Sequence, residues 1–548
     1  MAGEWPDVAG ERPDVTPPVP ADAPPGAQAQ DHEDPVRDWR FRGPWPLLAV
    51  LAVQAALSLR LVRADTANQG EAAYLNAGHL EWAHWLHGAP IPPFASYFSG
   101  APVIYPPVGA AADSLGLTGA RVLSLVFMLG ATALLWGTAS RLFGRQAAFF
   151  SAALFALLGT TLHLGAFATS DAMALFLVAV AAWCVVRAGD RGPETGWMVA
   201  AACALALANA AAYSSVLFDL VVALLALLTA PRASGGLLAA RRVATLLIVT
   251  AALLAAGLLA GGASYRTGVK LTILTGVPGS ASPLSVLANS WYWTGLVLVL
   301  AVCGVAFSWA GRAPATQTLL LAVLLAAAVV GPLEQAHLHS VASLYRHVGL
   351  GSWFAAIAAG YAVDRFITAG SAGRVRALTA GACVIALVFP AGVAFSQSWS
   401  LSTNWANASS FIAIFRPLAG HTTGPMLVED PSIAEYYLPA GAQWQRWSST
   451  RNIVLTGGIN TGNPSHAAGV TGAGNPGIYA RYIRAGYFSL VALNFTDTTG
   501  LDQQIVADLH RNHHYRLIQV VPYGIEIPPI GKGTYNIWRY EPATQPAG

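Results

Sequence analysis

The sequence has 548 residues, of which 55% are hydrophobic and only 10% are charged. This balance excludes a single soluble globular domain and is typical of a protein that crosses a membrane many times. The net charge of +3 is too small to indicate nucleic-acid binding. The four cysteines all lie inside apolar runs, which excludes a disulfide framework and a paired-thiolate metal motif.

The chain divides into three regions. Residues 1–42 are rich in Pro, Ala, Asp and Glu and lack aliphatic runs, so we predict a disordered tail. Residues 43–396 hold apolar stretches of membrane-spanning length, and residues 397–548 return to a mixed polar composition that predicts a soluble domain. The eleven predicted spans are 44–62, 119–140, 146–162, 171–188, 196–213, 214–230, 243–262, 287–309, 316–333, 348–364 and 377–396.

Basic residues are distributed unevenly over the connections between these spans. Alternate connections carry most of them: Arg141, Arg145, Arg187, Arg191, Arg232, Arg241, Arg242, Arg312, Arg365, Arg374 and Arg376. The positive-inside rule therefore predicts a cytoplasmic N-terminus. Loop 64–118, which follows the first span, is then expected outside. Because the number of spans is odd, the C-terminal domain is expected outside as well. The Arg-rich, Ala-rich and nearly Lys-free composition suggests a high-GC bacterium, and hence a bacterial cytoplasmic membrane.

The first outer loop, 64–118, concentrates ionisable residues in a chain that has few of them. Asp65, Glu71 and His79 lie close together, and such a cluster at a membrane surface is a candidate site for proton transfer. From Glu71 onward, residues such as Tyr74 and Trp82 recur at helical spacing. This pattern predicts an amphipathic helix lying on the membrane, with Glu71 near its start.

The rest of this loop is aromatic and rich in proline. Segment 91–107 ends in Tyr105-Pro-Pro and is not expected to form a regular helix. Asp171 opens the fourth span after Thr169-Ser170, either as a helix N-terminal charge or as a functional acid on the same outer face. The candidate acceptor- or substrate-binding residues are Tyr74, His79, Tyr105, Asp113 and Asp171.

Several basic residues lie on the face predicted to be outside, against the positive-inside preference, and their presence there needs an explanation. Recognition of an anionic phosphate is one, since guanidinium and ammonium groups form charge-assisted hydrogen bonds with phosphate oxygens. The candidate phosphate ligands are Arg266, Lys270, His337, His339, Arg346 and His347. The alternatives are snorkelling to lipid headgroups for Arg266 and Lys270, and metal ligation for His337 and His339.

In the C-terminal region, the hydrophobic runs 452–456 and 487–493 read as strands, with a helix around 501–511. Glu429, Asp430 and Glu435 are carboxylates of this region that could contact an acceptor. The predicted fold class is an α-helical polytopic membrane protein with about 11 transmembrane helices and a small C-terminal extracytoplasmic α/β domain.

Three sequence features together carry a family resemblance. Gly70-Glu71-Ala-Ala-Tyr74 in the outer loop, Tyr105-Pro-Pro before the second span and Thr169-Ser-Asp171 at a later span resemble the bacterial GT-C glycosyltransferases. More narrowly they resemble glycosyltransferase family 39, with the protein O-mannosyltransferases and aminoarabinose transferases. The resemblance covers roughly residues 44–396 and implies a GT-C-like fold. It also implies transfer of a sugar from a polyprenyl-phosphate carrier to an acceptor outside the cytoplasmic membrane.

The sequence departs from this family in the first outer loop. The family usually has an Asp-Glu pair there, and this chain has Gly70-Glu71. The resemblance therefore implies Glu71, or failing it Asp65, as the catalytic base. Transfer to a hydroxyl requires a carboxylate that accepts the proton and a cation that stabilises the leaving phosphate.

The expected partners are a polyprenyl-phosphate sugar donor, a protein, glycolipid or wall-polymer acceptor, and the lipid bilayer, but no nucleic acid. No cofactor is predicted with certainty, and a divalent metal is left open. Two alternatives of other classes also stay open. One is a catalytically silent relative that binds lipid phosphate or glycan, and the other is a secondary transporter.

Overall fold

The computed structural model describes residues 43–542 apart from gaps at 64, 93, 95–97, 99–103, 190–193, 231–234, 275–280, 342–343, 370–374, 404, 439–443, 451–475, 497 and 526–530. The predicted disordered tail, 1–42, lies outside the described residues, as does the predicted strand 452–456.

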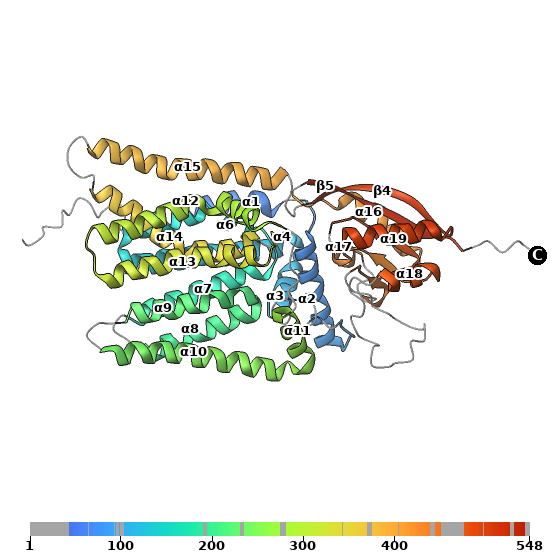
Figure 1. Ribbon diagram of the computed structural model, residues 1–548, viewed down its shortest axis with the longest axis horizontal. Helices are drawn as coiled ribbons and strands as arrows, with labels where there is room; N and C mark the ends of the chain where they lie inside the picture. Colours follow the sequence, from blue (N-terminus) through green and yellow to red (C-terminus); the bar gives the residue numbers. More distant parts are fainter. Residues whose placement is uncertain are drawn as a thin grey trace, which may run out of the picture. The chain divides into compact units, whose positions relative to one another are not determined.

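The N-terminal two thirds of the described chain is helical, and its long helices run alongside one another (Figure 1). Its elements outside the first loop are α1 (Trp45–Val62), α4 (Leu117–Phe143), α5 (Arg145–Ala156), α6 (Gly159–Leu164), α7 (Ser170–Arg187), α8 (Glu194–Ala211), η3 (Tyr213–Phe218), α9 (Asp219–Leu228), α10 (Gly235–Ala260), α11 (Gly262–Leu274), α12 (Pro283–Ala310), α13 (Ala315–His337), α14 (Leu344–Ala369) and α15 (Val375–Thr403).

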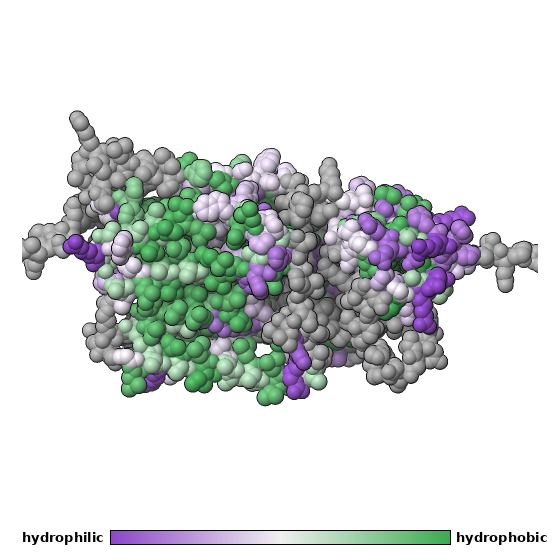
Figure 2. All heavy atoms as spheres, in the orientation of Figure 1, coloured by the Kyte–Doolittle hydropathy of each residue, from purple (hydrophilic) through white to green (hydrophobic). Residues whose placement is uncertain are grey.

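This bundle has the composition of a membrane protein. Among the described residues, seven helices are long and apolar enough to cross a membrane: α1, α4, α7, α8, α10, α12 and α13. Figure 2 shows hydrophobic residues over most of the bundle face, whereas hydrophilic residues gather on the C-terminal domain. The polytopic α-helical class is therefore confirmed, and the count of eleven spans stays a prediction.

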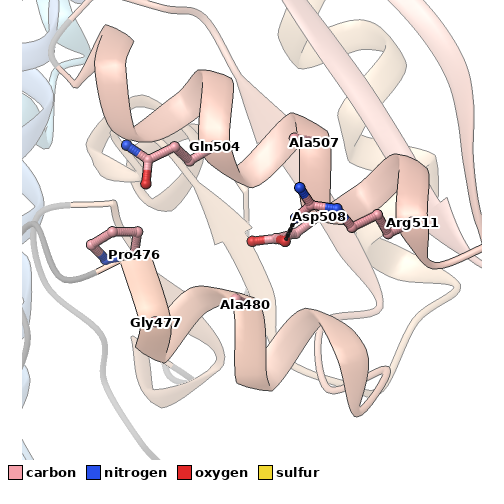
Figure 3. Close-up of a pocket in the computed structure, with 7 residues that line it drawn as sticks. All are labelled: Pro476, Gly477, Ala480, Gln504, Ala507, Asp508 and Arg511. Atoms are coloured by element: carbon pink, nitrogen blue, oxygen red, sulfur yellow. Dashed lines mark hydrogen bonds and ion pairs between the residues drawn. The ribbon is translucent and has the colours of Figure 1, made fainter.

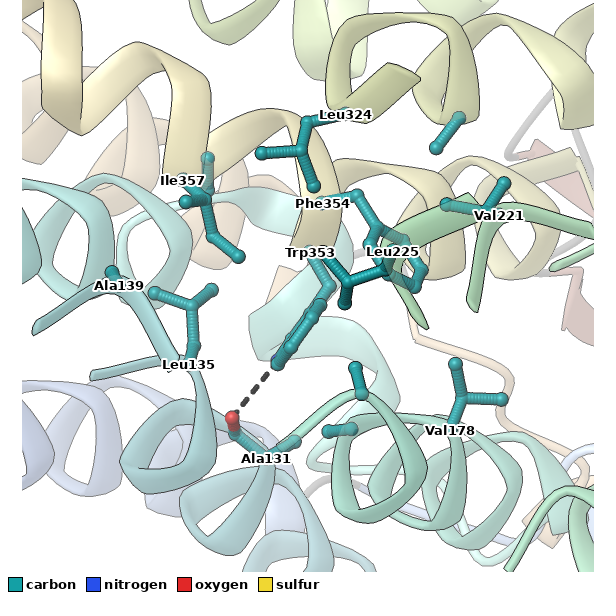
Figure 4. Close-up of a cluster of buried hydrophobic side chains, with 14 of the residues drawn as sticks. Ala131, Leu135, Ala139, Val178, Val221, Leu225, Leu324, Trp353, Phe354 and Ile357 are labelled. Carbon is teal, nitrogen blue, oxygen red and sulfur yellow. Dashed lines mark hydrogen bonds between the residues drawn. The ribbon is translucent and has the colours of Figure 1, made fainter. Parts of the chain in front are cut away.

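Large side chains fill the centre of the bundle (Figure 4). Trp353 on α14 is fully buried, and its indole Nε1 donates a hydrogen bond to the Ala131 carbonyl of α4 at 2.9 Å. Phe354 stacks on Phe218 of η3 with ring centroids 5.9 Å apart. A buried indole requires such an acceptor, because an unpaired polar group in an apolar core is costly. These contacts hold α14 against both α4 and the break between α8 and α9.

The loop predicted to lie outside, 64–118, contains two helices, α2 (Gln69–His87) and α3 (Tyr105–Asp113). The predicted helix at Glu71 is confirmed: Asn68 is its N-cap and Glu71 completes a capping box. The expectation that Tyr105-Pro-Pro cannot enter a helix was wrong, because these residues open α3. Proline is tolerated in the first turn, where its missing N–H would have had no partner within the helix.

The C-terminal region is the predicted small α/β domain. Its elements are α16 (Ser409–Gly420), β1 (Met426–Val428), α17 (Ser432–Tyr437), β2 (Trp447–Ser448), α18 (Pro476–Arg484), β3 (Leu490–Leu493), α19 (Thr499–Arg511), β4 (Tyr515–Ile525) and β5 (Gly531–Tyr540). The five strands form one sheet in the order β2-β1-β3-β5-β4. β1 pairs in parallel with β2 and β3, whereas β5 pairs antiparallel with β3 and β4. Phe411 and Tyr535 stack in its core.

Candidate active site

Glu71 is held at the start of α2 by four donors. Its side chain is fully buried. Oε1 accepts hydrogen bonds from Arg121 Nε at 2.8 Å and from the Ala168 N–H at 2.9 Å. Oε2 accepts from Arg121 Nη2 at 2.7 Å and from the Asn68 N–H at 3.0 Å. Each oxygen already accepts two hydrogen bonds, one of them charge-assisted. This geometry does not suit the predicted role of catalytic base, which needs a lone pair directed at a substrate.

A second carboxylate, Asp171, lies in the first turn of α7 and faces a cation. Arg346 Nη1, from the first turn of α14, is 3.4 Å from Asp171 Oδ2. The Thr169 hydroxyl donates to the same oxygen at 2.9 Å. The Asp171 side chain is 7% exposed and that of Arg346 is 18% exposed, so the carboxylate is buried and the guanidinium is partly exposed. A carboxylate and a guanidinium at the rim of an apolar bundle can together serve an acid–base step and bind an anion.

Aromatic residues of the first loop line this pair. Ser170 Oγ donates a hydrogen bond to the Tyr74 hydroxyl at 3.1 Å. Tyr105 meets Tyr74 edge to face, with ring centroids 5.7 Å apart. Burial, and after it the negative charge of Asp171, raise the pKa of Tyr74 above its ordinary value. Tyr74 is therefore a neutral phenol that can donate a hydrogen bond to a ligand.

The position at which this chain departs from the family pattern borders the same pair. A Cβ atom placed on Gly70 would lie 3.1 Å from Arg346 Nη2 and 3.8 Å from the Thr169 methyl group. Within the described part of the chain, no acceptor is hydrogen-bonded to that Nη2. The first turn of α2 therefore forms one wall of the Asp171–Arg346 site without placing a side chain in it.

Three other predicted residues contact elements outside this pair. His79 Nε2 is 2.8 Å from Asp113 Oδ2. Asp113 Oδ1 accepts a hydrogen bond from the Tyr436 hydroxyl of α17 at 2.7 Å. Asp65 is exposed and accepts a hydrogen bond from Asn407 Nδ2 at 2.8 Å. These residues join the first loop to the C-terminal domain.

The remaining predicted phosphate ligands are dispersed. Arg266 and Lys270 are exposed on α11, and Arg266 Nε donates to a carbonyl of its own helix at 3.2 Å. His337 and His339 are exposed at the end of α13. Among the described residues, none of these four has a hydrogen bond or ion pair to Asp171 or Arg346.

His347 follows Arg346 in the sequence but pairs with a different acid. Its Nδ1 is 2.9 Å from Glu334 Oε2 of α13. The structure therefore brings together Asp171, Arg346, Tyr74 and Tyr105 from the predicted set, and the other predicted cations have different partners or lie on other elements. Arg121 was not singled out from the sequence. Its signal was an arginine inside a predicted span, a position where a charge is costly without a partner.

No metal centre is evident in the described chain, where no group of three or more His, Cys, Asp or Glu side chains could hold an ion. A hollow in the C-terminal domain lies between α18 and α19 (Figure 3). Asp508 and Arg511, one turn apart on α19, form an ion pair at its wall, with Oδ1 and Nη1 2.6 Å apart. This hollow contains none of the predicted site residues.

The chain matches a family model over part of its length. The dolichyl-phosphate-mannose-protein mannosyltransferase model matches residues 112–265, which include α4 and Asp171. No curated protein matches the chain.

Several solved structures have folds similar to that of this chain. ArnT from Cupriavidus metallidurans bound to undecaprenyl phosphate has 14% identity and a TM-score of 0.56, over 90% of this chain and 98% of that one. The archaeal oligosaccharyltransferase AglB from Archaeoglobus fulgidus, in complex with an inhibitory peptide and a dolichol-phosphate, has 12% identity and a TM-score of 0.53, over 92% and 75%. Arabinofuranosyltransferase AftD from Mycobacteria has 14% identity and a TM-score of 0.50, over 91% and 42%.

The family model matches residues 112–265, and these solved structures share the fold of this chain, which agrees with the GT-C-like fold that the sequence motifs predicted.

Proposed function

We propose that this protein transfers a sugar from a polyprenyl-phosphate donor to an acceptor hydroxyl at the outer face of the bacterial cytoplasmic membrane. In this proposal the N-terminus is cytoplasmic and the C-terminal domain lies outside, as the distribution of basic residues favours. The observation that carries the proposal is the Asp171–Arg346 pair, 3.4 Å apart, whose guanidinium is partly exposed. The similar structures that contain undecaprenyl phosphate and dolichol-phosphate support this class of donor.

Arg346 is the proposed ligand of the donor phosphate. Its Nη2 is directed at the first turn of α2, where Gly70 has no side chain to occupy the space. A guanidinium presents a fork of donors that matches phosphate oxygens and stays charged at every physiological pH. It can therefore hold the phosphodiester of the donor and stabilise the charge on the leaving polyprenyl phosphate.

Asp171 is the proposed general base. As the bond between the anomeric carbon and the phosphate oxygen breaks, the acceptor oxygen attacks that carbon and its proton passes to an Asp171 oxygen. The electrons of the broken bond stay on the polyprenyl phosphate, next to Arg346. Thr169 orients the Asp171 carboxylate through its 2.9 Å hydrogen bond.

Glu71 takes a positioning role in this scheme. Its carboxylate connects α2 to Arg121 of α4 and to the Ala168 N–H just before α7. It therefore fixes the backbone that leads to Asp171. Asp65 stays the alternative base, because its carboxylate is exposed and bound by a single neutral amide among the described residues.

The test is reconstitution in lipid nanodiscs with a panel of labelled polyprenyl-phosphate sugars and membrane acceptors. Wild type, Asp171→Asn, Asp65→Asn and Arg346→Gln are compared for transfer and for donor binding. Transfer that is lost in Asp171→Asn while donor binding persists supports the proposal, and loss in Asp65→Asn alone moves the base to Asp65. Donor binding without transfer in wild type identifies the silent lipid-phosphate-binding relative, which the missing side chain at Gly70 favours. Absence of both leaves the secondary transporter.

A further inference from the structure

A short segment of the C-terminal domain, residues 429–437, contacts the first outer loop. We call this segment, which includes α17, the latch. Gln69 Nε2 donates a hydrogen bond to Asp430 Oδ2, and Asn76 Nδ2 donates to Glu435 Oε2 at 3.2 Å. The Ala67 N–H donates to the Tyr437 hydroxyl at 2.7 Å. With the Tyr436–Asp113 hydrogen bond, these contacts join the latch to α2, to the segment just before it and to α3.

The base of the latch is fixed within its own domain. Glu429, the first residue after β1, is 1% exposed. Its carboxylate accepts hydrogen bonds from the N–H groups of Asn494 at 2.7 Å, Phe495 at 2.5 Å and Thr496 at 2.8 Å, in the loop after β3. A carboxylate with several backbone donors is a strong local anchor. The latch therefore moves with the sheet of the C-terminal domain.

The first turn of α2 connects the latch to the Asp171–Arg346 site. Gln69 bonds to the latch, Gly70 faces Arg346 and Glu71 bonds to Arg121 in the bundle. These three consecutive residues thus contact three different elements: the latch, α14 and α4. Because backbone neighbours cannot move independently, a displacement of the latch changes the space between Gly70 and Arg346.

We propose that Asp430, Glu435 and Tyr437 are positioning residues, which set the first turn of α2 against Arg346 and so couple the C-terminal domain to sugar transfer. This inference rests on the proposed function for its effect on turnover. The geometric part, that the latch restrains α2, holds whether or not the protein is active.

Protonation of Glu435 is expected to control this coupling. Burial, and then the charge of Asp430, raise the pKa of Glu435 to about 8, against the opposing hydrogen bond from Asn76. The other ionisable groups that face the latch from the elements around it are Glu71 and His79 on α2, Asp113 on α3, Arg121 on α4, and Tyr436 and Tyr437 on the latch itself.

The sign of the pH effect follows from linkage. The latched state binds the Glu435 proton more tightly than a released, solvated state, in which the pKa is near the ordinary value of 4.5. The proton therefore favours latching fully below that value, and its contribution is lost as the pH rises through about 8. Ionised Glu435 beside Asp430 repels it and weakens the hold on α2.

The experiment compares wild type with Glu435→Gln in nanodiscs between roughly pH 6 and pH 9.5, a range around the raised pKa. Glutamine keeps an acceptor for Asn76 and is neutral at every pH. Amide hydrogen exchange of α2, corrected for the intrinsic pH dependence, reports latching without any need for turnover, and kcat and KM report its effect on the reaction. We expect α2 protection and kcat in wild type to fall as the pH rises from about 6 through about 8 and to level off above it, and both to be independent of pH in Glu435→Gln over the same range.

The matched control is Glu541→Gln, a glutamate of the same domain that pairs with Arg516 and Arg539 beyond the end of β5. It should retain the wild-type pH profile. Tyr437→Phe provides a second variant that keeps the ring but removes the hydroxyl, and it should reduce α2 protection at every pH and lower kcat several-fold with KM unchanged.

The outcomes separate the two proposals. Identical α2 exchange in wild type, Glu435→Gln and Tyr437→Phe across the pH range overturns the latch. Altered exchange in a protein that shows no transfer with any donor retains the latch and rejects the proposed function. Altered exchange with unaltered kcat shows that the latch does not position the site.

Discussion

Among the described residues, a buried carboxylate of α7, Asp171, meets a partly exposed cation of α14, Arg346, beside Gly70. Replacing Asp171 with Asn keeps the shape of the side chain and the Thr169 hydrogen bond but removes the proposed base. We expect kcat to fall by about 10²–10⁴-fold, the usual contribution of general base catalysis, with donor binding retained. Radiolabelled transfer and donor binding by scintillation proximity measure the two quantities.

Asp508→Asn is the control for this variant, because Asp508 lies on α19 and pairs with Arg511. It should transfer at the wild-type rate. If Asp171→Asn is as active as wild type, Asp171 is not the base and its pairing with Arg346 is structural.

Glu71 carries the opposite expectation, a loss of stability. Glu71→Gln leaves the Arg121 guanidinium, which is 1% exposed, without its carboxylate partner. Breaking a buried pair by removing one member costs about 3–5 kcal/mol. The thermal midpoint in detergent should drop by several degrees, and transfer should fall because Ala168 and the start of α7 shift. A variant with a normal midpoint and no turnover would instead restore Glu71 as the base.

The sequence predicted the position of Glu71 at the start of a helix, and its role as catalytic base stays a prediction. Helical spacing placed it at the start of a helix, because capping is determined by residues three positions apart. Its four donors come from α2, α4 and the segment before α7, and no local pattern indicates which distant side chains the bundle brings together. The Asp171–Arg346 pair was hidden for the same reason, although the sequence had placed both residues on the outer face.

At the scale of elements, α2 and α3 pack closely at Gly78. A Cβ atom there would overlap the Pro106 carbonyl group and lie 2.8 Å from the Ala110 Cβ. Gly78→Ala must therefore separate the two helices, and overpacking of this kind costs about 1–3 kcal/mol. We expect a lower thermal midpoint and a longer Trp82–Pro107 hydrogen bond, which is 2.8 Å in the native protein. Tryptophan fluorescence and thermal unfolding report the two effects.

Gly257→Ala on α10 is the matched helical substitution, since nothing lies within 4 Å of a Cβ atom at that position. Alanine is the better helix former, so this variant should equal or exceed wild type in stability. Equal effects of the two substitutions would show that α2 and α3 can separate without cost.

Elements with strong periodicity or hydrophobicity were the predictable ones. The apolar stretches coincide with helices of the bundle. In an apolar environment the backbone N–H and C=O groups must bond to one another, and a helix does this within one segment. α3 was missed because prolines usually interrupt helices, and here they occupy the first turn. The sheet order could not be predicted, because β1 lies between β2 and β3 through pairings that are distant in sequence.

At the scale of the whole molecule, a bound donor that contacts several helices should stabilise the folded bundle. The proposed phosphate site collects α2, α7 and α14, so a polyprenyl phosphate bound there favours the folded bundle by mass action. A ligand at 100 times its Kd stabilises by about 2.7 kcal/mol. We expect polyprenyl phosphate to raise the thermal midpoint of wild type by a few degrees, and to raise that of Arg346→Gln much less.

Neutral polyprenol is the control, because it shares the chain and lacks the phosphate. If the apolar helices alone determine binding, polyprenol and polyprenyl phosphate will stabilise wild type equally, and Arg346→Gln will respond like wild type. If polyprenyl phosphate stabilises wild type more than polyprenol does, and this difference is lost in Arg346→Gln, the phosphate binds beside Arg346 and Gly70. This result needs no turnover, and therefore applies equally to an active transferase and to a silent relative of the same fold.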